Sequence, residues 1–166
     1  MTCAWFLSHR ADPEACKIAD RHYNRQKIGS PQFVPPGRCM VLRAETETGR
    51  ALWVTSWPFA EYVKHAWAGA WVCSLFRNEG AGRASDLIRQ AVAATLSYYG
   101  DAPDLGMVTF VNRAKVTPKA DPGHCYIIAG FRPCGQTKGG LDALQLRPEK
   151  MPAPAPAIGF QLGMIA

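Results

Sequence analysis

The stretch RNEGAG at residues 77–82, followed shortly by Ser85, has the residue types and spacing to bind a phosphate group. A helix N-terminus offers free N–H groups and partial positive charge, and a guanidinium group such as that of Arg77 binds phosphate oxygens as a fork. Gly80 and Gly82 would let the backbone come close to the anion. The spacing therefore predicts a phosphate-binding loop. The alternative is a structural turn in which Arg77 forms an ion pair with Glu79.

Three other positions carry side chains that could do chemistry. His22 could serve as a base, because an imidazole has a pKa near neutrality and can deprotonate an amine. The alternative for His22 is a histidine packed at the edge of the core. Asn112, after an apolar run, could orient a substrate or cap the next turn. Asp121 precedes Pro122, a position where aspartate also forms turns.

The elements that must position these residues are predicted from apolar spacing. The apolar run at residues 71–76 indicates a strand. Between Leu87 and Leu96 the apolar residues recur with the period of one buried helix face, and Gly100 is expected to end that helix. Ser85 near the helix start is expected to satisfy free amides. The predicted order is therefore strand, glycine-bearing loop, helix.

The rest of the chain predicts a mixed-sheet α/β domain. Asp12 and Pro13 are typical of a helix start, and His22 and Tyr23 are expected on that helix. Two β-rich runs around Gly49 predict an antiparallel hairpin. We expect one domain over residues 1–147 and a proline-rich, poorly packed tail over 148–166. Further strands are predicted at residues 3–8, 107–111 and 142–146, and a short helix at 124–130.

The composition favours a partner that carries negative charge. The formal net charge is +6, which suits a nucleic acid or a phosphate-bearing coenzyme. No run of about 18 apolar residues is present, so no membrane span is expected. The first residues do not have the pattern of a signal peptide, and a cytoplasmic location is expected. The six cysteines form no Cys-x-x-Cys pair, which favours free thiols over a zinc site.

The loop, the order of elements and the stretch AGF at residues 129–131 resemble the GNAT acetyltransferases, whose coenzyme loop has the signature Gln/Arg-x-x-Gly-x-Gly/Ala. This resemblance covers residues 3–147. It implies a single GNAT-like α/β domain, with a mixed, mostly antiparallel sheet, flanking helices and a central strand–loop–helix coenzyme site. It also implies acetyl transfer from acetyl-CoA to an amine, with the thioester carbonyl held by a backbone N–H of the fourth strand. The coenzyme-binding residues would be Arg77, Asn78, Gly80, Ala81, Gly82 and Ser85.

A narrower resemblance is to the Mom family of GNAT-like DNA-modification enzymes. It is carried by His22-Tyr23, Phe76-Arg77, TFVN at 109–112 and DPG at 121–123. It implies that the protein adds a carbamoylmethyl or acyl-type group to adenine N6 and so protects double-stranded DNA from restriction. A bacterial host cell and a phage or prophage origin would follow. The resemblance places His22, Tyr23 and Asp121 in the active centre, with Asn112 as a further catalytic candidate, and implies an iron ion bound by Tyr23 and Asp121.

Two other functions stay open at this point. The protein could be an ordinary GNAT N-acetyltransferase that acts on a small-molecule or peptide amine, or a non-catalytic module that binds nucleic acid or a partner. Aromatic residues at 53–67, interleaved with Lys64 and His65, could stack on a flipped base. They could equally fill the core or form a homodimer contact. These aromatic residues are Trp53, Trp57, Phe59, Tyr62 and Trp67.

Overall fold

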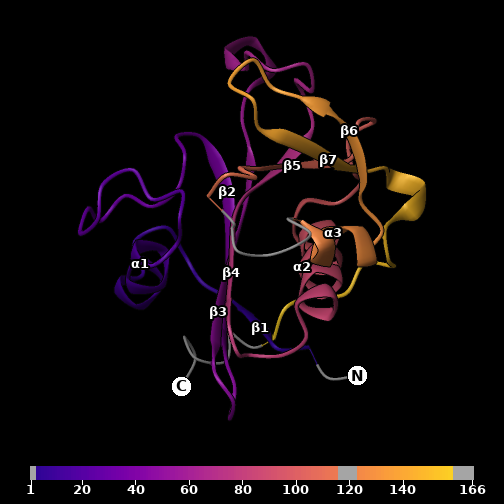
Figure 1. Cartoon of the computed structure of the whole chain (residues 1–166). Coiled ribbons are helices and arrows are strands. Elements are labelled where there is room, and N and C mark those ends of the chain that lie inside the picture. Colours follow the sequence, from indigo (N-terminus) through magenta and orange to yellow (C-terminus); the bar gives the residue numbers. More distant parts are fainter. Residues whose placement is uncertain (1–2, 116–122, 159–166) are drawn as a thin grey trace.

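Seven strands form one mixed sheet in the order β1-β2-β3-β4-β5-β7-β6 (Figure 1). The computed structural model describes residues 3–115 and 123–158. Neighbouring strands are antiparallel except for β4 and β5, which are parallel. The domain is therefore mixed α/β with a mostly antiparallel sheet, as predicted. The strands are β1 (Trp5–Leu7), β2 (Arg38–Glu45), β3 (Arg50–Trp57), β4 (Trp71–Glu79), β5 (Met107–Val111), β6 (Arg132–Gln136) and β7 (Asp142–Leu146).

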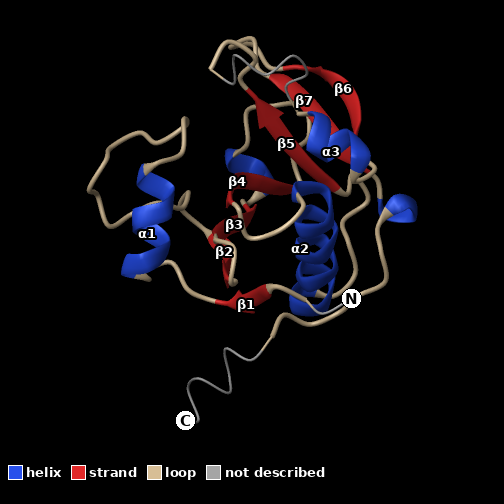
Figure 2. Cartoon of the chain, turned by 60° about the horizontal axis from the view of Figure 1, so that its bottom comes forward, coloured by secondary structure: helices blue, strands red, loops and turns tan. Residues whose placement is uncertain are grey.

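Three α-helices cover the two faces of the sheet. Helix α1 (Pro13–Asp20) lies on one face, and α2 (Ala84–Tyr99) and α3 (His124–Ile128) lie on the other (Figures 1 and 2). Two short 3-10 helices, at Ala60–Tyr62 and Pro148–Lys150, complete the described structure. Within residues 3–115 and 123–158 no helix has the length and apolar character needed to cross a membrane.

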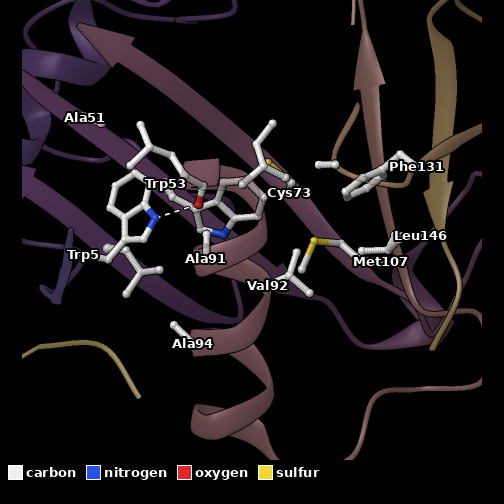
Figure 3. Packing of buried hydrophobic residues seen from close by; sticks show 14 of the residues in the cluster. Trp5, Ala51, Trp53, Cys73, Ala91, Val92, Ala94, Met107, Phe131 and Leu146 are labelled. Carbon is white, nitrogen blue, oxygen red and sulfur yellow. Dashed lines mark hydrogen bonds between the residues drawn. The ribbon is translucent and has the colours of Figure 1, made fainter. Parts of the chain in front are cut away.

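Each face of the sheet carries its own hydrophobic cluster. The larger one joins α2 to the sheet through Trp53 and Trp71, both fully buried (Figure 3). Trp5 belongs to this cluster and donates its indole N–H to the carbonyl oxygen of Leu87 at 2.8 Å. The smaller cluster joins α1 to the opposite face through Ile18 and neighbouring residues. Burial on both faces therefore keeps the middle strands in place.

The parallel pair β4 and β5 is short. It extends only from the pairing of Trp71 with Met107 to that of Cys73 with Thr109. Beyond Cys73, β4 continues beside β3 alone, and Figure 1 shows β5 running away from it. A register shift between β3 and β4 also leaves Ser74 without a paired residue on β3. The sheet therefore opens between β4 and β5.

Helix α1 starts as predicted but ends earlier than expected. Asp12 caps it by accepting a hydrogen bond from the backbone N–H of Glu14 at 2.9 Å. The helix ends at Asp20, and its cap residue is Arg21. His22 and Tyr23 therefore lie in the turn after the helix, and their predicted place on it is wrong. Arg25 forms an ion pair with Asp20 at 2.8 Å and holds the chain in this reversal.

The C-terminal part differs from the prediction at one strand. Strand β6 was not expected, because Pro133 and Gly135 are poor strand residues; they lie at a register shift in its pairing with β7. The segment after Lys150 is extended, and most of residues 151–158 are exposed. Two backbone hydrogen bonds tie it to the domain: the N–H of Ala155 donates to the carbonyl oxygen of Ala93 on α2, and that of Ile158 donates to the carbonyl oxygen of Trp5 at 2.7 Å.

Candidate functional site

The opening between β4 and β5 is a cleft of about 680 Å³. Four segments distant in the sequence meet there: the turn after α1, the second half of β4, the end of β5, and α3. Among the described residues its lining carries three cationic side chains and no carboxylate. The cations are Arg21, Arg77 and Lys115. Such a cleft attracts anionic ligands.

His22 and Tyr23 line this cleft together. Their rings stack at 4.5 Å between centroids. Burial lowers the pKa of His22, while its hydrogen bond with Asn24 acts in the opposite direction. Burial raises the pKa of Tyr23, whose hydroxyl interacts with the backbone of Asn112 across the cleft. At neutral pH His22 is therefore a neutral base and Tyr23 a neutral phenol.

Asn24 was not singled out from the sequence, yet it holds His22 in place. Its amide nitrogen donates to the carbonyl oxygen of Ser74 at 3.1 Å. Its side-chain oxygen therefore faces Nδ1 of His22, at 2.6 Å. The backbone N–H of Asn24 also points at Nδ1, at 3.2 Å, so Nδ1 faces one donor and one acceptor of the same residue, and these contacts fix the position of the ring. The pattern His-Tyr-Asn contains no periodic signal that would have identified this contact.

Arg77 lines the cleft, and it forms the ion pair with Glu79 that was the alternative to phosphate binding. Its Nε donates to Glu79 at 2.6 Å, and Arg21 binds the same carboxylate at 2.6 and 2.7 Å. The hydrogen bond from Arg21, with a further one from Arg77, lowers the pKa of Glu79 to about 2. Arg77 is a strand residue of β4 and not a loop residue. Its terminal nitrogens have no partner among the described residues.

The predicted loop is organised by protein contacts. Asn78 binds it at both ends, accepting from the N–H of Ala81 at 3.0 Å and donating to the carbonyl of Gly82 at 2.8 Å. Gly80 has a φ of +84°, and a Cβ there would lie 3.0 Å from the carbonyl oxygen of Thr48. Gly80 is therefore required by its backbone conformation and by the β2–β3 turn, and no close approach to an anion is needed to explain it.

The N-terminus of α2 is open to ligands in part. Its cap residue is Arg83, which makes no side-chain capping bond, and Ala84 lines the cleft. Ser85 is buried in the first turn and does not cap the helix as expected. Ala81 and Gly82 face a separate hollow of about 420 Å³. The structure therefore brings Arg77, Asn78 and the first helical residue to the cleft, but not Gly80, Ala81, Gly82 or Ser85.

The base of the cleft contains polar groups that the sequence did not identify as a site. The hydroxyl of Tyr126 lies 3.7 Å from the thiol of Cys73, and Thr109 donates to the carbonyl of Cys73 at 3.1 Å. Burial raises the pKa of Cys73 to about 12 and that of Tyr126 well above its usual value. Both groups stay protonated at neutral pH. Tyr126 is therefore a hydrogen-bond donor at the point where β4 and β5 separate.

The remaining predicted site residues are placed less favourably. Asn112 uses its side-chain oxygen to accept from the N–H of Ala114 at 3.1 Å, which is the turn-capping alternative. Asp121 lies outside the described residues. Among the residues that are described, no group of three or more His, Cys, Asp or Glu side chains could hold a metal ion.

The aromatic residues at 53–67 do not form one platform. Trp53 is fully buried in the core. Trp67 packs against Phe110, which lines the cleft, at 5.9 Å between ring centroids. Phe59 and Tyr62 are 53% and 76% exposed. The set therefore divides into core residues, cleft-supporting residues and an exposed pair.

Comparisons of the chain with protein-family models, with curated proteins and with solved structures find no match. The resemblances to GNAT and Mom proteins therefore stay predictions, and the geometry of the cleft carries the functional argument.

Proposed function

We propose that the protein is a GNAT-like, coenzyme A-dependent transferase that modifies the N6 amine of adenine in double-stranded DNA, as Mom-like enzymes do. The observation that carries this proposal is the cleft between β4 and β5. It joins a neutral histidine, His22, to a partly free guanidinium, that of Arg77, and to the first residue of α2, Ala84. These groups come from distant segments, as an acyl-transfer site requires.

The coenzyme side of the site would be formed by β4 and α2. Arg77 has terminal nitrogens without a partner among the described residues, and Lys115 also lines the cleft. Guanidinium and ammonium groups bind phosphate oxygens, and open amides at a helix N-terminus add to that attraction. Beyond Cys73, β4 has lost β5 as a partner, so its edge offers backbone groups to a thioester carbonyl. This arrangement supports the GNAT-like assignment.

An acid and a base are available for acyl transfer. Acetyl-CoA, when bound, supplies an acyl group activated as a thioester. His22 can accept a proton from an attacking amine, because burial keeps its imidazole neutral. Tyr126 can donate a hydrogen bond or a proton at the base of the cleft. Adenine N6 is a weak nucleophile inside a duplex, so a positioned base and base flipping would both be needed.

Coenzyme binding can be tested by thermal unfolding with acetyl-CoA. At 100 times its dissociation constant, a ligand that binds only the folded state stabilises it by roughly 2.7 kcal/mol. We expect Arg77→Ala to lose most of that shift and Arg147→Ala, which replaces an exposed arginine outside the cleft, to keep it. Equal shifts in both variants would contradict the coenzyme site.

The DNA substrate can be tested by total digestion and mass spectrometry of DNA from cells that express the protein. We expect a modified deoxyadenosine with the wild-type protein and none with His22→Ala. Unmodified nucleosides in both samples would count against a DNA substrate. Thiol release from acetyl-CoA with small amines, unaffected by DNA, would instead support an ordinary N-acetyltransferase.

A further inference from the structure

A further hollow, of about 390 Å³, lies where β1 ends, β2 begins and α2 ends. It shares no lining residue with the cleft between β4 and β5. Among the described residues none of its lining is acidic. Its polar lining residues are Ser8, His9, Arg10, Arg38, Cys39, Tyr98 and Tyr99.

The two arginines of this hollow have no carboxylate partner within the described residues. Arg10 donates to the carbonyl oxygens of Gly37 and Pro35 at 3.1 and 3.0 Å. Arg38 donates to the carbonyl oxygen of Trp57 at 3.2 Å. Carbonyl groups orient a guanidinium without neutralising its charge. Most other arginines of the described chain are paired with acids: Arg21, Arg25, Arg43, Arg50, Arg77, Arg113 and Arg147.

The hydroxyl of Tyr99 is buried and has no hydrogen-bond partner among the described residues. A buried polar group without a partner costs stability, so such groups are rare in folded proteins. Arg10 and Arg38 lie close enough to influence this hydroxyl electrostatically. Among the described residues the hollow thus gathers two cationic groups and no carboxylate.

Exposed aromatic rings border the same arginines. Arg38 stacks on Trp57 at 4.3 Å and on Phe59 at 5.0 Å. Phe59 and Tyr62 contact each other and are both exposed. Aromatic rings beside arginines are the surfaces on which nucleic-acid bases and sugars stack. This neighbourhood favours a nucleic acid over a free phosphate ion.

We propose that Arg10 and Arg38 bind a backbone phosphate of nucleic acid, with Phe59 and Tyr62 against the adjoining nucleotides. The inference rests on the proposed function, which gives the reason why the protein would bind DNA. It adds a DNA contact that lies outside the cleft. The end of α2 at this hollow carries partial negative charge, but both arginines give their hydrogen bonds to carbonyls of other segments. Their terminal charge remains available to a phosphate.

The test is fluorescence anisotropy of a short labelled DNA duplex across a range of salt concentrations. We expect the double variant Arg10→Gln/Arg38→Gln to bind about tenfold more weakly at 0.1 M salt. The slope of log affinity against log salt should decrease by about 1, the value for one lost phosphate contact. A control with the same charge change, Arg50→Gln/Arg147→Gln, should keep the wild-type slope. Equal affinity of the two double variants would overturn the proposal.

Tyr99→Phe provides a structurally conservative control in the wall of the hollow. It removes the buried hydroxyl that has no partner among the described residues, so the melting temperature without DNA should rise, while DNA affinity should stay unchanged. Two further results would overturn the nucleic-acid assignment as a whole. One is that the wild-type protein binds acetyl-CoA but does not bind DNA. This result would leave the proposed coenzyme site unaffected. The other is stabilisation by inorganic phosphate, lost in Arg10→Gln/Arg38→Gln, without any DNA binding.

Discussion

The two halves of β4 differ in what surrounds them. From Trp71 to Cys73 the strand is paired with β5, and from Val72 it is paired with β3 as well; Trp71 and Cys73 are buried. Beyond Cys73 its only strand partner among the described residues is β3, and Arg77 and Asn78 are partly exposed in the cleft. One strand thus belongs to the core at its beginning and lines the cleft at its end. Binding groups become available where a strand loses a ladder partner.

The largest expected effect comes from a substitution in the first half of β4, which packs in the core. Trp71→Ala removes a fully buried indole and should lower the free energy of unfolding by about 3–5 kcal/mol in urea titrations. Trp71→Phe should cost much less, because it keeps an aromatic ring and removes an indole N–H that has no partner among the described residues. A loss below about 1 kcal/mol for Trp71→Ala would contradict the assignment of this half to the core.

The next effect concerns the chemistry of the open half. His22→Ala should lower kcat by about 10²–10⁴-fold, the usual range for loss of a general base. The free energy of unfolding should change far less than in Trp71→Ala, because His22 lies in a turn outside the hydrophobic clusters. Activity within threefold of the wild type would exclude His22 as the base.

A smaller effect is expected at Asn24, which positions His22. Asn24→Ala should lower activity about tenfold, because the ring of His22 loses its contact with the side chain of Asn24 and is less well positioned. Asn24→Asp keeps a side-chain oxygen beside Nδ1, and its negative charge should raise the pKa of His22. Nitrogen-15 NMR of the imidazole would measure that pKa without any activity assay. An unchanged pKa of His22 in Asn24→Asp would refute this role.

The smallest effect is the pH dependence contributed by Glu79. Its pKa is lowered to about 2 in the folded protein from an ordinary value of 4.5, so its stabilisation is present above pH 4.5 and is lost as the pH falls towards 2. Because the group is near the surface, we expect about 1 kcal/mol or less. Urea unfolding at several pH values should show a shallower acid dependence for Glu79→Gln than for Glu149→Gln, which replaces an exposed glutamate.

Local signals were enough to predict much of the fold. Asp12 and Pro13 start α1, Gly49 lies at the β2–β3 turn, and Gly100 ends α2, because capping and turn chemistry depend on a few neighbouring residues. Strand β6 escaped prediction because Pro133 disfavours a strand. It forms only because β7 supplies the partner edge.

The site was harder to predict than the fold. Arg77 and His22 were found by residue type and by family resemblance, and both line the cleft. Asn24 and Tyr126 were missed, because their roles depend on contacts with Ser74 and Cys73, some 50 residues away in the sequence. The glycine loop was assigned to anion binding, whereas Gly80 is explained by the neighbouring β2–β3 turn. Short-range spacing does not contain such long-range contacts.

The close contact between Gly49 and the end of β4 means that the β2–β3 turn fixes the position of Glu79 and, through it, the positions of Arg21 and Arg77. A Cβ at Gly49 would lie 1.9 Å from the carbonyl oxygen of Glu79, whose side chain binds both Arg21 and Arg77. Hairpin turns usually tolerate substitution and added residues. This one should tolerate neither, since any bulk there displaces the carboxylate and, with it, two guanidinium groups at the rim of the cleft.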